Sequence, residues 1–294
     1  MSWHNIIITK PSKLSLRNSR LVIEQEEKIE IPLEDISSVV VETKEAVITS
    51  ALLSRFAQEA IPVFFCDAVH LPAGVCLPFQ QHSRCLKVLN AQLEQTEPFK
   101  KNCWKLIVQR KIKNQAKCLE LLKLDGADEL HALAAEVKSG DTTNRESTAA
   151  QIYFNSLMPS ATRRTEDVTN AVLNYGYAII RGAVARSLTA YGFVCALGIH
   201  HKNELNAFNL ADDFIEAFRP AVDLWAGKNI CSVSEFSVKE KTALVSLLNK
   251  DIVIDTKRQN IYRAIEITAA SYVSAIKNGD AQLLKLPELI DFTK

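Results

Sequence analysis

Apolar and polar residues alternate with a period of two between residues 5 and 42, in segments such as KLSLRN, RLVIEQ and KIEIPL. This period is typical of strands that bury one face. Residues that suit tight turns interrupt the alternation at Pro11, Asn18-Ser19, Glu26-Glu27 and Pro32. The pattern therefore predicts a small antiparallel sheet at the start of the chain.

A helix and one more strand are expected to complete this sheet domain. Thr49 and Ser50 provide an N-cap for a helix that turns four apolar residues inward: Leu52, Leu53, Phe56 and Ala57. The apolar run IPVFFCD, residues 61–67, predicts a buried strand that returns to the sheet. Residues 70–79, HLPAGVCLPF, contain two prolines and a glycine and are the best candidate for a linker.

Helical spacing dominates the rest of the chain. Leu86, Leu89 and Leu93 repeat at this spacing, and a second series follows Pro98: Trp104, Val108, Ile112, Leu119 and Leu122. A helix is predicted over residues 145–157, which Thr142, Thr143 or Asn144 can cap, and further helices over 167–192 with Gly192 at the end and over 258–279. We expect an α+β fold in which a small N-terminal β domain, residues 1–76, precedes a larger all-helical domain, residues 77–294.

Composition adds limits on the class of protein. The hydrophobic content is 47% in 294 residues, enough for a substantial core. No stretch approaches the roughly 20 uncharged apolar residues of a membrane span, and the start MSWHNIIITK does not resemble a signal peptide. The seven cysteines are scattered without a C-x-x-C pair, which argues against a disulfide framework or a zinc knuckle. A soluble, cytoplasmic protein without membrane partners is expected.

The formal net charge of +1 conceals a basic region. Residues 80–124 contain ten Lys and Arg against three Glu, a local balance of +7. Basic helical faces bind polyanions in some proteins and are merely solvated in others, so this pattern alone leaves both readings open.

Residues 198–220, GIHHKNELNAFNLADDFIEAFRP, contain adjacent histidines and several acidic residues that are candidate metal ligands. Asn209 is a good N-cap for a short helix over LADDFIEAF, in which Asp213 and Glu216 share one face. His201 can meet Glu216 across the intervening loop, giving two ligands of mixed nitrogen and oxygen type that suit Mn²⁺ or Mg²⁺. The same residues also suit a hydrogen-bonded surface loop followed by ordinary helix capping, and a third ligand is not evident from spacing.

Three ordered motifs resemble the CRISPR-associated integrase family, the universal endonuclease subunit of CRISPR adaptation. The first is the Gly-x-x-His at Gly198–His201, followed fifteen residues later by Glu216 in DFIEAFRP; the others are ESTAAQIYF, residues 146–154, and RRTEDVTNAVLNYGYAII, residues 163–180. The resemblance covers nearly the whole chain and looks most like members from type II systems. This chain departs from many members by having Ser147 where they have glycine.

The resemblance implies a set of roles for particular residues. Glu146, His201 and Glu216 would be catalytic and would bind Mg²⁺ or Mn²⁺, while Asp213 would be a capping or orienting acid. Double-stranded DNA would bind to basic side chains: Arg84, Lys105, Arg110, Lys111, Arg163 and Arg164. A 3′-hydroxyl of a short foreign DNA, the protospacer, would attack the CRISPR repeat end in a transesterification supported by the metal.

The resemblance also implies partners. The family is expected to act as a homodimer that a small ferredoxin-like adaptation subunit bridges into a hetero-hexamer, with the β domain making dimer and partner contacts. In a type II system, the RNA-guided nuclease and a further adaptation subunit would be additional partners. Two other functions remain open on the sequence: a metal-dependent nuclease that hydrolyses branched or single-stranded DNA, and a non-catalytic DNA-binding scaffold.

Overall fold

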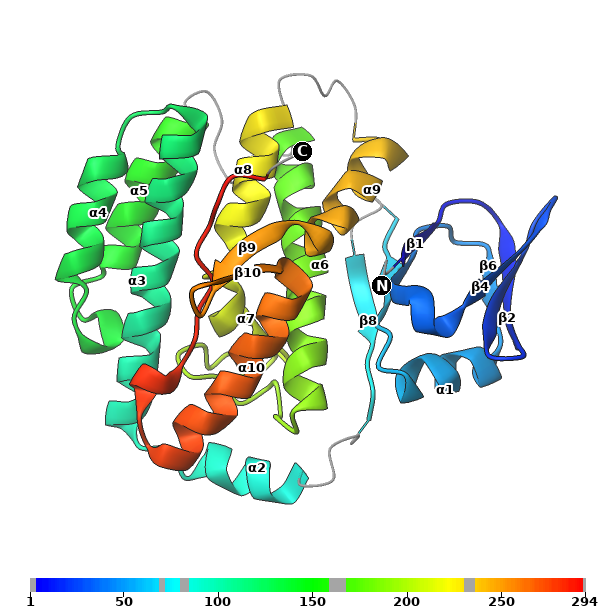
Figure 1. Cartoon of the computed structure of the whole chain (residues 1–294), viewed down its shortest axis with the longest axis horizontal. Helices are drawn as coiled ribbons and strands as arrows, with labels where there is room; N and C mark the ends of the chain where they lie inside the picture. Colours follow the sequence, from blue (N-terminus) through cyan, green and yellow to red (C-terminus); the bar gives the residue numbers. More distant parts are fainter. Residues whose placement is uncertain (1–3, 69–71, 80–84, 159–167, 230–235, 293–294) are drawn as a thin grey trace. The chain divides into compact units, whose positions relative to one another are not determined.

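A computed structural model describes residues 4–68, 72–79, 85–158, 168–229 and 236–292 of the chain. The chain divides into two compact units, Met1–Ser83 and Arg84–Lys294. Strands fill the first unit and helices dominate the second (Figure 1), which confirms the predicted α+β class. No helix in the described ranges is both long and apolar enough to cross a membrane.

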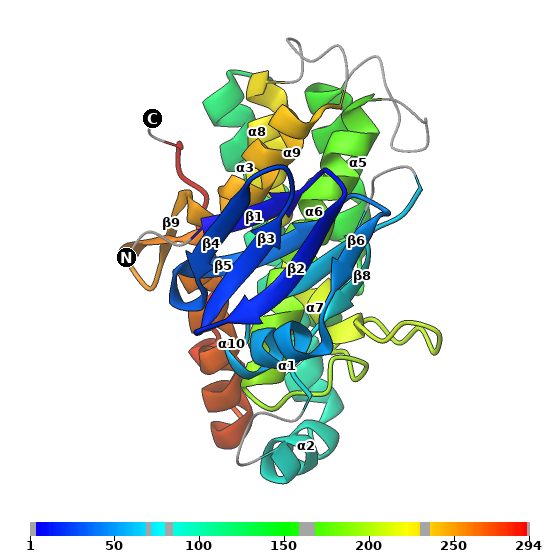
Figure 2. The ribbon, with the colours of Figure 1, turned by 90° about the vertical axis from the view of Figure 1, so that its right-hand side faces the viewer.

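The β unit contains two four-stranded sheets. One has the order β1 (His4–Ile8), β5 (Ile36–Val41), β7 (Val63–Cys66) and β8 (Pro72–Cys76). The other has the order β4 (Lys28–Pro32), β3 (Arg20–Glu24), β2 (Ser12–Arg17) and β6 (Ala46–Ile48), and its strands lie side by side in Figure 2.

The expectation of one antiparallel sheet is correct only for β2, β3 and β4. Strand β5 pairs in parallel with both β1 and β7, and β6 pairs in parallel with β2. All six residues of β5 are buried, as expected for a strand in the middle of a sheet with both faces covered. The parallel pairs are possible because long connections separate the partners along the chain, and alternation within a strand carries no information about such partners.

The proposed linker, residues 70–79, is also wrong in part. Residues 72–76 form β8, which pairs antiparallel with β7. Pro72 is the first residue of this strand, and the strand lies at the sheet edge, where a missing backbone N–H is tolerated.

Helix α1 (Ser50–Gln58) begins as predicted, because the Thr49 hydroxyl accepts a hydrogen bond from the Leu52 N–H. Its buried side chains, Leu52 and Phe56, join a core that includes Leu14 and Val39 from the strands.

The second unit is not all-helical as expected, because it contains one β-hairpin beside its helices. The helices are α2 (Cys85–Leu93), α3 (Glu97–Leu122), α4 (Ala127–Glu136), α5 (Arg145–Leu157), α6 (Val168–Ala190), α7 (Asn209–Ile215), α8 (Arg219–Asn229), α9 (Val238–Val245) and α10 (Ile261–Asn278). The hairpin pairs β9 (Asp251–Ile254) with β10 (Lys257–Asn260). Short 3-10 turns occur at Leu33–Asp35, Ser139–Asp141, Ser246–Asn249 and Ala281–Leu283.

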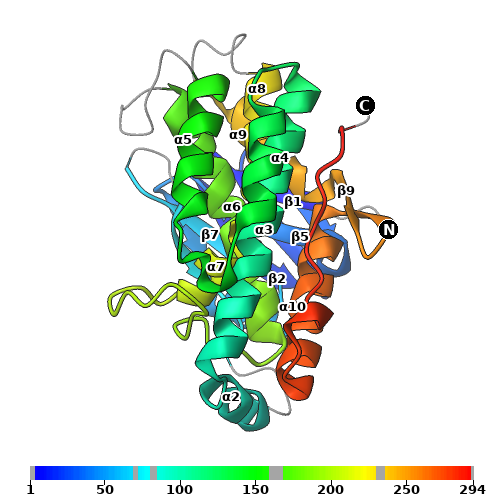
Figure 3. The same ribbon diagram turned by 90° about the vertical axis from the view of Figure 1, so that its left-hand side faces the viewer.

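Helix α3 is the central support of this unit (Figure 3), with contacts to α4, α5 and α8. Four of the five residues predicted for its apolar face are buried, Trp104, Val108, Ile112 and Leu119, and Leu122 near the end of the helix is half-buried. The long helix predicted over residues 167–192 is α6, followed by Gly192 at a φ of 89°.

Two helical predictions need correction. In α2 it is Val88 and Gln92 that are buried, while Leu86 and Leu93 are exposed. Leucine spacing did not identify the buried face, because the polar side chain of Gln92 is hydrogen-bonded there through both its nitrogen and its oxygen. Its Nε2 donates to the carbonyl groups of residues 194 and 197, and its Oε1 accepts a hydrogen bond from the Val194 N–H. The last helix begins at Ile261 rather than at residue 258, because the preceding residues belong to the hairpin and Asn260 caps the helix.

Candidate functional site

The loop before α7 is organised around the Asp213 carboxylate. Asp213 is fully buried and accepts hydrogen bonds from the backbone N–H groups of Ile199, His200 and His201, at 2.5, 3.1 and 3.1 Å. The Nδ1–H group of His201 donates to the same carboxylate at 2.7 Å. Asp213 therefore fixes both the loop backbone and the orientation of the imidazole, in agreement with the orienting role expected for it.

Gly198 is required by the close approach of this loop to α7. A Cβ at position 198 would lie 2.3 Å from the His201 carbonyl oxygen and 2.9 Å from Asp213 Oδ2. Real Cβ atoms do not make contacts this short, so steric exclusion explains why glycine is the first residue of the Gly-x-x-His motif.

The two adjacent histidines have different roles. The His200 ring stacks on Trp104, with centroids 4.2 Å apart and planes at 1°, while His201 meets the same indole edge-on at 5.8 Å. Trp104 is buried on α3. Aromatic stacking thus attaches the loop to α3, and His201 is left as the histidine whose ring is held by a carboxylate.

Asn209 and Asn144 do not cap helices with their side chains as expected. Asn209 is the first residue of α7, and its amide instead bonds within the loop, to the Ala196 and Asn203 carbonyls. At α5, Asn144 makes no side-chain cap, and the buried Asp141 carboxylate accepts the N–H groups of Arg145 and Glu146 at 2.9 and 3.0 Å. Asp141 therefore fixes the first turn of α5, from which the Glu146 side chain extends.

Glu146 and Glu216 meet at a lysine. The ammonium of Lys111, on α3, lies 2.6 Å from Glu146 Oε1 and 2.5 Å from Glu216 Oε2. Glu216 follows the end of α7, and its other oxygen lies 2.9 Å from Nε of Arg219, the first residue of α8. The side chains of Lys111 and Glu216 are only 11% and 7% exposed. Three separate parts of the chain thus converge on one charged cluster.

The charges of this cluster support one another. Burial raises the pKa of Glu216, but the Lys111 and Arg219 charges outweigh it and hold that pKa below its ordinary value. Burial lowers the pKa of Lys111, and the Glu216 and Glu146 carboxylates overcome this and raise it above its ordinary value. The hydrogen bond to Asp213 raises the pKa of His201. The Glu216 carboxylate is therefore held in its charged form, the form that binds a cation.

A divalent cation fits the donor set, although its ligands are not already assembled. Within the part of the chain that the structure describes, no three His, Cys, Asp or Glu side chains converge as a ready ligand group. The structure brings together Glu146 and Glu216, which already share one cation, Lys111. His201 uses Nδ1 for Asp213, and Nε2 has no hydrogen-bond partner among the described residues. Two carboxylates and a carboxylate-oriented imidazole match hard, oxygen-preferring ions such as Mg²⁺ and Mn²⁺.

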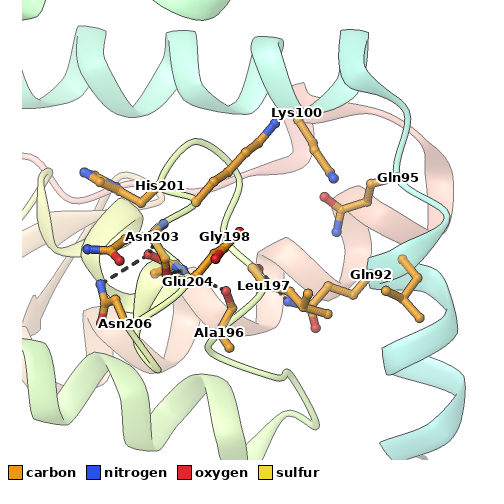
Figure 4. A pocket seen from close by; sticks show the side chains of 13 residues that line it. Gln92, Gln95, Lys100, Ala196, Leu197, Gly198, His201, Asn203, Glu204 and Asn206 are labelled. Atoms are coloured by element: carbon orange, nitrogen blue, oxygen red, sulfur yellow. Dashed lines mark hydrogen bonds between the residues drawn. The ribbon is translucent and has the colours of Figure 1, made fainter.

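A cavity of about 470 Å³ opens beside His201. Its walls come from the end of α2, the start of α3 and the loop before α7 (Figure 4), and polar side chains line much of it: Gln92, Gln95, Lys100, Lys202, Asn203, Glu204, Asn206 and Asn209. A cavity of this size takes a small group such as one nucleotide rather than a duplex.

The basic side chains expected to bind DNA have mixed outcomes. Lys111 faces the two glutamates rather than solvent, and Arg110 pairs with Glu288 at 2.9 Å. Lys105 lies half-buried on α3 and stays a candidate. Arg84, Arg163 and Arg164 lie outside the described residues.

Three further arginines each pair with an acid inside the helical unit. Arg181 pairs with Asp212, Arg186 lies near Glu266, and Arg219 pairs with Glu216. Ordinary structural pairing accounts for these interactions.

Sequence reasoning missed three contributors to this site: the bridging role of Lys111, the stacking of Trp104, and the cap from Asp141. Only Asp141 left a local signal, since an acid just before a helix is a common capping residue. Lys111 and Trp104 lie on a different helix, far along the chain from the residues they contact.

Fold and site together define an α+β protein whose helical unit gathers two glutamates on a lysine and a histidine on an aspartate. The family described as CRISPR associated protein Cas1 matches residues 6–241, and the chain belongs to this family. It is 41% identical over 299 residues to the CRISPR-associated endonuclease Cas1 of Neisseria meningitidis serogroup C (strain 8013), covering 99% of this chain and 97% of the relative.

Solved structures share the fold. A casposase bound to its integration product superimposes with a TM-score of 0.77 at 17% identity, over 100% of this chain and 94% of the other. A chain of a Cas6-RT-Cas1–Cas2 complex gives 0.77 at 19% identity, over 99% of this chain and 36% of that longer chain.

Proposed function

We propose that this chain is a divalent-metal-dependent DNA integrase and endonuclease of CRISPR adaptation. The observation that carries the proposal is the convergence of Glu146 and Glu216 on a single cation, together with a histidine that Asp213 orients and whose charge lowers the pKa of Glu216. Family membership and the relative named an endonuclease agree with this chemistry. Because the substrate is genomic DNA, the protein would act in the cytoplasm.

On this proposal Glu146, Glu216 and His201 would hold Mg²⁺ or Mn²⁺. The cation would supply Lewis-acid stabilisation of the scissile phosphate and would position the attacking oxygen. The carboxylates of this chain provide the negative charge for the ion, and Asp213 keeps Nδ1 of His201 protonated, so that Nε2 is the ring nitrogen with an available lone pair. This nitrogen would bind the ion or move a proton at the leaving oxygen.

The proposed reaction is a transesterification. The 3′-hydroxyl of a protospacer attacks a phosphodiester at the end of a CRISPR repeat, one P–O bond forms as another breaks, and no ATP is needed. The casposase of similar fold, solved with an integration product, supports strand transfer over simple hydrolysis.

The proposed assembly is a homodimer that a small ferredoxin-like subunit bridges into a hetero-hexamer. The similar fold found within a Cas6-RT-Cas1–Cas2 complex supports a small second subunit. In a type II system, the RNA-guided nuclease and one more adaptation subunit would join this assembly.

The test combines the purified chain, its small partner subunit, a labelled DNA fragment and a plasmid that carries the repeat. Fragments end in a 3′-hydroxyl or a 3′-dideoxynucleotide, and the reactions contain Mg²⁺, Mn²⁺ or EDTA. We expect joined products only with a cation and a 3′-hydroxyl. Joining that persists in EDTA excludes the metal mechanism, whereas shortened strands without joined ones favour the hydrolytic nuclease.

Variants assign the reaction to the site. Glu146→Gln and Glu216→Gln keep the side-chain size and should abolish joining. Glu120→Gln is the matched control, because Glu120 is an exposed acid on α3 that pairs with Lys117 and with His131 of α4, away from the charged cluster. If the two site variants join DNA as well as the control does, the scaffold function is favoured.

A further inference from the structure

Lys111 occupies the point between the two carboxylates that the proposed metal would need. Its ammonium is within 2.6 Å of both Glu146 and Glu216, and its side chain is almost fully buried. Two carboxylates in such proximity, of which Glu216 is buried and Glu146 is partly buried, repel each other strongly without a counter-charge. Lys111 thus supplies to the metal-free protein the positive charge that holds α3, α5 and the end of α7 together.

The charge balance of the cluster opposes a second cation. Two glutamates against Lys111 and Arg219 give a net charge of zero. A divalent ion raises the total to +2 and places like charges within contact distance of the ammonium. The ion must therefore displace Lys111 from the oxygens, or gain extra negative charge from elsewhere.

DNA is the source of that extra charge in the proposed reaction. A phosphodiester next to the site brings one negative charge per phosphate, and this can pair with the displaced ammonium while the ion takes the carboxylates. Bound DNA then lowers the free-energy cost of binding the ion, and the bound ion lowers the cost of binding DNA by the same amount, because coupling between two ligands is reciprocal.

We propose that Lys111 is a resident cation of this site that weakens metal binding in free protein and makes it depend on bound DNA. The inference rests on the proposed function, since it assumes that Glu146 and Glu216 bind the ion. Lys111 acts here as a positioning residue: it maintains the metal-free site and sets the condition under which the ion enters.

The test measures Mn²⁺ affinity by electron paramagnetic resonance of the free ion, with and without a 3′-dideoxy DNA fragment that cannot be joined. In the wild-type protein, DNA should strengthen Mn²⁺ binding by about tenfold or more, which is 1.4 kcal/mol or more in coupling. Lys111→Met should bind Mn²⁺ at least about tenfold more tightly without DNA, and DNA should strengthen its binding much less.

Stability provides a second readout that does not depend on activity. Without metal, Lys111→Met should unfold at a lower temperature than wild type, because the glutamates lose their counter-charge, and Mn²⁺ should restore more stability to the variant than to wild type. Lys111→Arg keeps the charge and should retain both metal-free stability and the dependence on DNA. Lys117→Met removes a cation from the same helix, where it pairs with exposed Glu120 at 2.8 Å, and should leave Mn²⁺ affinity unchanged.

The outcomes separate this inference from the proposed function. If wild type binds no Mn²⁺ even with DNA, the metal site itself is wrong. If wild type binds Mn²⁺ but Lys111→Met binds it no more tightly, or keeps the same response to DNA, the resident-cation role of Lys111 is wrong while the metal site stands. A Lys111→Met protein that stays unfolded in Mn²⁺, while Lys111→Arg loses the response to DNA, also overturns it.

Discussion

Replacing Asp213 by asparagine should release the histidine loop. The Asp213 carboxylate accepts three backbone N–H groups and one imidazole N–H, and it is fully buried. In Asp213→Asn one oxygen remains to accept from His201, but an NH₂ group then faces the N–H donors of Ile199 and His200. A buried donor left without an acceptor costs about 1–3 kcal/mol, so two donors give a loss of about 2–6 kcal/mol.

Amide hydrogen exchange measures this loss where it occurs. If the substitution lowers the free energy of local opening by about 3 kcal/mol, hydrogen exchange at the Ile199 and His200 amides should accelerate by more than about a hundredfold. Exchange at amides in the middle of α6 should change little. Asp212→Asn is the matched control, because Asp212 binds Arg181 and Asn206 rather than these amides. Exchange at residues 199–201 that stays within about threefold of wild type would refute the role given to Asp213.

Other parts of the site give further expectations. Gly198→Ala should disorder the same loop and reduce DNA joining by more than about tenfold, since the new Cβ meets the His201 carbonyl; normal joining by this variant would contradict the steric argument. Trp104→Ala should destabilise the protein by about 3–5 kcal/mol, measured by urea unfolding, because it removes a buried indole and the His200 stack; a loss below about 1 kcal/mol would be inconsistent with that packing. In EDTA, wild type should have a larger free energy of unfolding than His201→Asn. This difference should be greatest below the ordinary His pKa of about 6.5 and should decline as pH rises through the raised pKa of folded His201. A difference that grows between pH 6 and pH 9 would show that the charged imidazole is not stabilising.

The order of β and helical units could be predicted from sequence because it depends on local periodicity. The period-two segments before residue 42 form strands and the leucine-rich segments after residue 84 form helices. Helix ends at Thr49 and Gly279 were also predictable, since a hydroxyl that accepts a backbone N–H and a residue with positive φ act on their immediate neighbours.

Strand partners and buried faces required the tertiary structure. Strand β5 lies between β1 and β7 in parallel, and nothing within residues 36–41 identifies partners that lie more than twenty residues away. In the same way, Gln92 rather than a leucine faces inward on α2 because three backbone groups of a distant loop need its amide.

The residues of the candidate site also divide into those that the sequence predicts and those that only the tertiary structure identifies. A short motif placed His201, Asp213 and Glu216 close together in the sequence, so their grouping could be predicted. Lys111 lies 35 residues before Glu146 and 105 before Glu216, and on sequence alone it belongs to a basic helix suited to DNA. Only folding brings its ammonium between the two carboxylates, because the charge that compensates a buried acid is chosen by proximity in space and not by order along the chain.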